Sequence, residues 1–109
     1  MASDFYCEEV LSGRTVVKVV AETSQVLAFH HTRPAYPVNI VVIPKRHIAS
    51  LLATDENDND LLMEMLAVIR KIATQITEEH QGCRVITNLG QYQDSKHLHW
   101  HIVSGQAFQ

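Results

Sequence analysis

The sequence is poor in the residues that mark special classes of protein. Two of its 109 residues are cysteines, three are prolines and four are glycines. Two cysteines outside any Cys-x-x-Cys pair cannot form the disulfide framework of a small secreted protein. We therefore expect reduced thiols and a cytoplasmic location. The scarcity of proline and glycine predicts short connections between regular elements.

Long hydrophobic runs and an excess of positive charge are also missing. No apolar run approaches the roughly 20 residues of a membrane-spanning helix, and the first residues show neither region of a secretory signal. The chain carries 9 basic and 12 acidic residues, a formal net charge of -3. This balance does not suit non-specific binding to nucleic acid. We therefore expect neither a membrane nor a nucleic acid as partner.

The residues that are present indicate one folded domain. Apolar residues make up 46% of the chain, a share typical of globular proteins, and a chain of this length has room for one hydrophobic core. We expect a single domain over residues 1–109. The unusual count is histidine, because there are seven and three of them fall within five positions near the C-terminus.

Hydrophobic patterning predicts mostly strands and one long helix. The five expected strands cover residues 15–21, 26–30, 38–43, 84–88 and 97–103. Apolar residues at steps of three and four predict a helix over residues 54–79, and a short helical turn is expected between Ser3 and Gly13. The expected apolar face of the long helix is Leu62, Met65, Leu66, Ile69, Ile72, Ala73 and Ile76. This order predicts an α+β fold with an antiparallel sheet.

Residues 97–103, His-Leu-His-Trp-His-Ile-Val, carry the strongest chemical signal. Alternate residues of a strand face the same side, so His97, His99 and His101 are expected to project together while the apolar residues between them face a core. At least one of three crowded imidazoles should be neutral near pH 7 and therefore nucleophilic. Two chemistries fit this pattern: attack on phosphorus by a neutral imidazole, or a metal site.

The same segment resembles the signature of the histidine triad (HIT) superfamily, in which three histidines alternate with apolar residues. The resemblance covers nearly the whole chain in the family's order. Its further parts are Leu27-Ala28-Phe29, the proline-rich turn at 32–37, Val-Val-Ile-Pro-Lys-Arg-His-Ile at 41–48, the long helix, Arg-Val-Ile-Thr-Asn-Leu-Gly at 84–90, and Gln93 four residues before His97. The chain looks most like the nucleotide-binding, phosphoramidase-like branch.

The resemblance implies a homodimer whose protomers each contribute a five-stranded antiparallel sheet, one long helix and one or two short helices. It implies a hydrolase or nucleotidyl transferase that binds purine nucleoside monophosphates. The bonds cleaved would be those at the α-phosphorus of nucleoside phosphoramidates or related anhydrides. His99 would be the nucleophile and form a covalent nucleotidyl-histidine. Neither a cofactor nor a metal is expected in this scheme.

The resemblance also implies roles for the residues around the nucleophile. His97 would help to hold the His99 ring in the right tautomer, and His101 would contact the scissile phosphate. Asn88 matches an asparagine that contacts the nucleotide near its phosphate. Gln93 matches the glutamine that opens the phosphate loop.

Three positions depart from the family pattern. Asn39 stands where the family has a fourth histidine, and His31 stands where an acidic residue contacts the ribose. Asp94 stands where a serine assists the leaving group. Ser95, the next residue, is expected to take the place of that serine only if the loop shifts. All four are expected near the bound nucleotide.

Several alternatives remain open from the sequence. One is a dinucleoside polyphosphate hydrolase, and another is a nucleotide-binding module with weak catalysis, which the three departures favour. A third is a metal-dependent enzyme that uses the strand histidines. Some family members also carry zinc on an N-terminal cysteine pair, where this chain has Cys7 with Asp4 in place of the second cysteine. His47 would be a further ligand of such a site.

Overall fold

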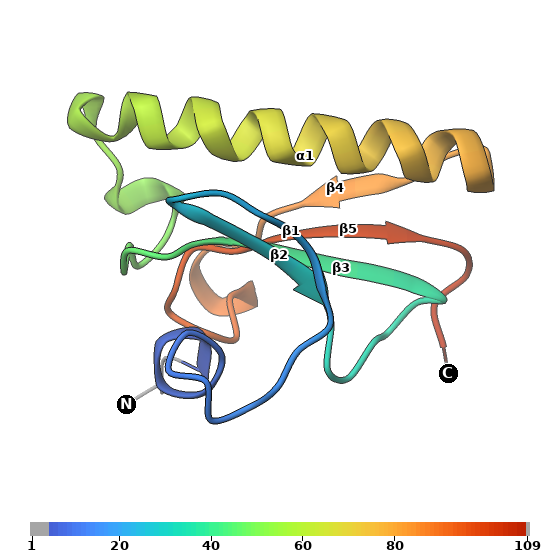
Figure 1. Cartoon of the computed structure of the whole chain (residues 1–109), viewed down its shortest axis with the longest axis horizontal. Coiled ribbons are helices and arrows are strands. Elements are labelled where there is room, and N and C mark those ends of the chain that lie inside the picture. Colours follow the sequence, from blue (N-terminus) through green and yellow to red (C-terminus); the bar gives the residue numbers. More distant parts are fainter. Residues whose placement is uncertain (1–4, 109) are drawn as a thin grey trace.

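A long helix, α1 (Asn59–His80), lies across one face of a five-stranded antiparallel sheet (Figure 1). The computed structural model describes residues 5–108. The strands are β1 (Val19–Glu22), β2 (Val26–His30), β3 (Val38–Pro44), β4 (Arg84–Ile86) and β5 (Trp100–Ser104), in the sheet order β1-β2-β3-β5-β4. Four short helical turns complete the fold: η1 (Tyr6–Val10), η2 (Leu51–Ala53), η3 (Glu56–Asp58) and η4 (Gly90–Tyr92). The α+β class and the antiparallel sheet are confirmed.

The strand β3 lies in the middle of the sheet. It pairs with β2 on one side and with β5 on the other, and its residues from Asn39 to Pro44 are all buried. Continuous apolar sequence is typical of a strand that is covered on both faces, so the expectation for residues 38–43 is confirmed.

The two faces of the sheet are covered differently. On one face, α1 packs on the larger core, to which it contributes Leu61, Met65, Val68, Ile69, Ile72 and Ile76. On the other face, η1 packs on a smaller apolar cluster formed by Tyr6, Val10, Leu27, Phe29, Val41 and Ile43. Because η1 is short, it leaves part of this second face for a pocket.

The helix differs from its expected face and ends. Leu66 is 44% exposed, so its expected place in the core is wrong, and Leu61 and Val68 are buried instead. The stripe that a helix buries depends on how it is rotated against the sheet, which periodicity alone does not reveal. The helix ends at His80, one residue beyond the expected end, and Gln81 follows it in the left-handed conformation (φ 70°).

The acidic residues before α1 form a separate turn. The Asp55 side chain accepts a hydrogen bond from the Asn57 amide (2.8 Å), and the Asp58 side chain accepts one from the Asp55 amide (2.9 Å). This reciprocal capping box delays the start of α1 to Asn59. Asp58 also pairs with Arg46 at the end of β3, which ties this turn to the sheet.

Three strands are shorter than expected. β1 starts at Val19, since Val16 is 92% exposed, and β4 ends at Ile86. β5 starts at Trp100, so His97 and His99 precede the strand. No helix within residues 5–108 combines the length and the hydropathy that crossing a bilayer requires.

Candidate active site

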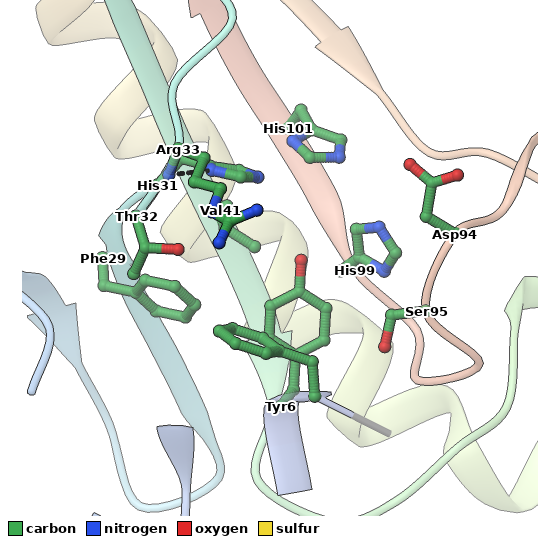
Figure 2. A pocket seen from close by; sticks show the side chains of 11 residues that line it. Tyr6, Phe29, His31, Thr32, Arg33, Val41, Asp94, Ser95, His99 and His101 are labelled. Carbon is green, nitrogen blue, oxygen red and sulfur yellow. Dashed lines mark hydrogen bonds between the residues drawn. The ribbon is translucent and has the colours of Figure 1, made fainter. Parts of the chain in front are cut away.

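A cavity of about 430 Å³ opens on the sheet face that α1 does not cover. Figure 2 shows its side chains, which come from η1, β2, β3, β5 and two loops. The lining consists of Phe5, Tyr6, Phe29, His31, Thr32, Arg33, Val41, Asp94, Ser95, His99 and His101. Two of the three triad histidines therefore meet in one pocket with both residues of the expected leaving-group loop.

A hydrogen bond of the His99 ring determines its chemistry. Its Nδ1 lies 2.7 Å from the backbone oxygen of His97. A carbonyl oxygen can only accept, so Nδ1 donates and carries the proton. In the neutral ring the lone pair is then on Nε2. The ring packs against Tyr6 (4.9 Å between centroids) and His101 (5.1 Å), and these contacts fix its orientation.

His101 is held in the neutral state. Its pKa is lowered to about 4, first by burial, then by the charge of His99 and that of His31, while Asp94 opposes the shift. The ring meets His99 edge-on and stacks on His31, with centroids 5.7 Å apart and planes inclined at 26°. The expectation that at least one clustered imidazole is neutral near pH 7 therefore holds for His101.

His31 lies in the loop after β2. Its Nδ1 accepts a hydrogen bond from the Arg33 amide at 2.9 Å, so in the neutral ring the proton is on Nε2. The pKa of His31 is lowered by burial and by the charge of His99. The residue therefore presents an N–H donor where the family pattern has a carboxylate.

The loop after η4 brings Asp94 and Ser95 to the pocket. The Gln93 amide nitrogen anchors it by donating to the Ala49 carbonyl oxygen (2.7 Å), and the Lys96 ammonium donates to the Gln93 carbonyl oxygen (3.2 Å). Ser95 reaches the pocket in this conformation, so the expected loop shift is not needed. Within residues 5–108, its buried hydroxyl makes no hydrogen bond.

Three expected nucleotide-binding residues do not line the pocket. Gln93 is buried beneath the loop that it anchors, and Asn88 is half-buried on the segment after β4. Asn39 is buried in β3, where its backbone oxygen accepts a hydrogen bond from the His31 amide (2.8 Å). Its side-chain oxygen has no hydrogen-bond partner in the described part of the chain. Gln93 thus anchors the loop that carries Asp94 and Ser95, and the Asn39 backbone holds the start of the loop that carries His31.

The His97 ring lies apart from the other two. It is fully buried, and its Nε2 donates to the Pro44 carbonyl oxygen (2.8 Å). Its Nδ1 lies 3.3 Å from the sulfur of Cys7, which in turn is 3.9 Å from Nδ1 of His47. The expectation that three imidazoles project together is therefore wrong. The alternation of a strand does not apply before Trp100, since the Leu98 amide bonds the Ile48 carbonyl oxygen (2.6 Å) instead of a sheet partner.

Cys7, His47 and His97 have the composition of a metal site. Their ligand atoms all lie within 4.8 Å of one another. One thiolate and two imidazoles are typical zinc ligands, and the bond to Pro44 leaves the Nδ1 lone pair of His97 directed at this cluster, as outer-shell partners do in zinc sites. The residues therefore fit zinc. Asp4, the expected ligand beside Cys7, is outside the described residues.

Some pocket residues carry little signal in the sequence. Tyr6 and Phe29 are apolar core residues by pattern, and Thr32 and Arg33 belong to a proline-rich turn that looks like a plain connection. That Phe29 and Val41 lie together in the pocket could have been expected from the pairing of β2 with β3, in which these two residues are opposite each other.

A family model described as the HIT domain matches residues 13–108. The chain belongs to the HIT domain family. A HIT-like protein of Buchnera aphidicola, described as uncharacterized, is 32% identical over 101 residues, which cover 91% of this chain and 90% of the relative.

Solved HIT-domain structures share the fold. A HIT family hydrolase from Legionella pneumophila superposes with a TM-score of 0.81 at 30% identity, covering 93% of this chain and 91% of that one. A hypothetical histidine triad nucleotide-binding protein from Sulfolobus tokodaii superposes with a TM-score of 0.80 at 28% identity, covering 92% and 67%. This HIT domain therefore has hydrolase-type relatives, and its pocket contains the imidazoles that such chemistry needs.

Proposed function

We propose that this HIT domain cleaves bonds at the α-phosphorus of purine nucleoside phosphoramidates or related nucleotides, through a covalent nucleotidyl-His99. The observation that carries the proposal is the hydrogen bond from His99 Nδ1 to the His97 carbonyl oxygen. It keeps the proton on Nδ1 and the lone pair on Nε2, which is the form of imidazole that attacks phosphorus. His97 would act through its backbone oxygen rather than through its ring.

The reaction would proceed in two displacements. In the first, Nε2 of His99 attacks phosphorus, and the bond to the leaving nitrogen or oxygen breaks as that atom takes the electron pair and a proton from solvent. In the second, water attacks phosphorus, the bond to Nε2 breaks, and the proton of the water passes to solvent. Two displacements replace one difficult step with two easier ones.

Neighbouring groups would stabilise the charge on phosphorus. His101 is neutral and packs edge-on against His99, so its N–H can donate to a non-bridging oxygen without requiring protonation. Ser95 lines the same pocket, and its hydroxyl, which is buried without a hydrogen-bond partner within residues 5–108, could donate to the phosphate or to the leaving group after a rotation of the side chain. Zinc bound by Cys7, His47 and His97 would have a structural role, because it would join η1 to the sheet.

Measurements of substrate turnover decide between the functions that the sequence leaves open. Adenosine phosphoramidate should be hydrolysed by the wild-type protein with or without EDTA, with far-UV circular dichroism showing that EDTA leaves it folded. The variant His99→Ala should be inactive, whereas His80→Ala, which changes an exposed histidine at the end of α1, should keep wild-type activity. Tight AMP binding without turnover would replace this proposal with a binding module, and faster turnover of diadenosine polyphosphates would assign the dinucleotide activity.

A metal-dependent enzyme that uses all three triad histidines is the weaker alternative. Such a site needs three convergent imidazoles, and the ring of His97 lies with Cys7 and His47 instead of with His99 and His101. Loss of activity in EDTA from a protein that stays folded would nevertheless favour it.

We also propose that two copies pair as a homodimer. β4 is an edge strand, and its central residue Val85 is 43% exposed; Met63 and Leu66 on α1 are exposed apolar residues as well. An uncovered strand edge with apolar neighbours is typical of an interface. Light scattering should give a dimer mass for the wild type and a monomer mass for Val85→Glu.

A further inference from the structure

The pocket has a second polar region on the far side of the His31–His101 stack. Three consecutive residues line it: His31, Thr32 and Arg33. Figure 2 shows the Thr32 hydroxyl and the Arg33 side chain directed into the pocket from the loop that follows β2. None of the three takes part in the chemistry proposed for His99.

This region presents hydrogen-bond donors and a positive charge. The Nδ1 of His31 already accepts the Arg33 amide, so only the Nε2–H of the neutral ring remains for a ligand. Arg33 adds a guanidinium that is always protonated. The Arg33 guanidinium has no ion pair with any carboxylate of residues 5–108.

Among residues 5–108, Asp94 is the one carboxylate in the pocket lining. It acts on His101 and comes from the loop on the other side of the histidines (Figure 2). The pocket thus has a basic side at Arg33 and an acidic side at Asp94, with the imidazoles between them. A ligand group beside Arg33 and His31 would meet donors and positive charge, and no carboxylate of residues 5–108 lines that side of the pocket.

We propose that His31, Thr32 and Arg33 bind a second phosphate, carried on the sugar of the nucleotide. The preferred ligands would be nucleoside 2′,5′- or 3′,5′-bisphosphates and their derivatives at the 5′-phosphorus. This inference rests on the proposed function, because it assumes that the 5′-phosphate lies at His99. The ring of His101 contacts both His99 and His31, so the two phosphates would be separated by one imidazole, a spacing that a single ribose can bridge.

The physical reason is that this loop offers hydrogen-bond donors at the place where the family pattern has a carboxylate acceptor. A carboxylate suits sugar hydroxyls and repels phosphate, whereas arginine binds phosphate through two parallel N–H···O bonds. Dinucleotide-binding folds use the same exchange, an acid for a free ribose hydroxyl and an arginine for a phosphorylated one. Here the loop supplies an arginine and an imidazole N–H, and the part of the chain that the structure describes places no acid on this side of the pocket.

Calorimetric titration of the full chain tests the proposal with four ligands: AMP, ADP, adenosine 2′,5′-bisphosphate and adenosine 3′,5′-bisphosphate. One of the two bisphosphates should bind about tenfold or more tightly than AMP. ADP carries its extra phosphate on the 5′ chain and should not show this gain. The preference should weaken as salt is raised, because part of it is electrostatic.

Variants identify the residues responsible. Arg33→Ala should reduce the ratio of bisphosphate affinity to AMP affinity to about one, and His31→Asp should make the bisphosphates bind more weakly than AMP. Arg70→Ala, which removes an exposed arginine from α1, is the matched control and should keep the preference.

The outcomes separate this inference from the proposed function. Equal binding of AMP and both bisphosphates, or an equal gain for ADP, would overturn the second phosphate site while His99-dependent turnover of the phosphoramidate stands. A preference that survives Arg33→Ala would also overturn it. No binding of AMP together with no turnover would reject the proposed function, and this inference with it.

Discussion

His97 and His99 are two residues apart, yet their rings lie in different parts of the molecule. The ring of His97 is enclosed with Cys7 and His47 behind the pocket, and the ring of His99 forms part of the pocket wall. The backbone oxygen of His97, which bonds the His99 ring, and the Tyr6 ring, which contacts both imidazoles, link the two regions. The difference indicates that one histidine holds the structure and the other carries the chemistry, so their substitutions should separate stability from activity.

The largest effect is expected for His99→Ala. The variant loses the proposed nucleophile, so phosphoramidate turnover should fall by roughly 10³-fold or more. Its free energy of unfolding should fall by about 1–2 kcal/mol, less than for His97→Ala, because the His99 ring already borders an open pocket and its hydrogen bond is worth about 1 kcal/mol. Steady-state kinetics and urea titration on the same preparation measure both quantities. If His99→Ala kept a tenth of the wild-type activity, His99 would not be the nucleophile, and the two histidines would not differ in role as described above.

His97→Ala should have the opposite effects, a large loss of stability and little loss of activity in the folded protein. It leaves a cavity in a fully buried place and an unpaired carbonyl oxygen at Pro44, so the free energy of unfolding should fall by about 3 kcal/mol. The fraction that remains folded should still turn over substrate, because its backbone oxygen still holds His99. Inactivity of a protein shown to be folded by circular dichroism would assign a chemical role to the His97 ring.

Zinc should stabilise the cluster behind the pocket. Binding at about 100 times Kd adds about 2.7 kcal/mol, which should raise the melting temperature by about 10 °C. Calorimetry and metal analysis should find one zinc per chain. Cys7→Ser should lose this shift and Cys83→Ser, outside the cluster, should keep it. An unchanged melting temperature of the wild type in zinc would reject the site.

The pH dependence of stability should report on the pocket imidazoles. The pKa of His101 is about 4 in the folded chain and about 6.5 when unfolded, so between these values the unfolded state binds more protons. The contribution of His101 to the free energy of unfolding should be constant above pH 7 and decrease by about 1–2 kcal/mol between pH 6.5 and pH 4. Below pH 4 it should not change further. His31 acts in the same direction.

Urea midpoints at a series of pH values measure this decline. The variant His101→Gln should flatten the curve, whereas His80→Gln, which alters an exposed histidine, should not. An unaltered slope in His101→Gln would show that the ring is not held neutral by the fold.

The sequence predicted the sheet, the long helix and the class of site, because those depend on periodicity and on a motif. Short apolar runs placed β2 and β3 correctly, and the triad motif pointed to His99 and His101, which line the pocket. The position of the His97 ring could not be predicted, because it depends on where β5 begins, and the amide of Leu98 bonds Ile48 across the fold. Arg33 was also missed, because only tertiary packing brings a turn residue into the pocket.

The central claim is a covalent bond between His99 and the nucleotide. Adenosine phosphoramidate is mixed with the protein, quenched within milliseconds under alkaline denaturing conditions that preserve phosphorus–nitrogen bonds, and analysed by intact-mass spectrometry and peptide mapping. The account predicts a gain of one adenylyl group on the peptide that contains His99, and no gain in His99→Ala. Turnover without any adduct, or an adduct on His101, would contradict it.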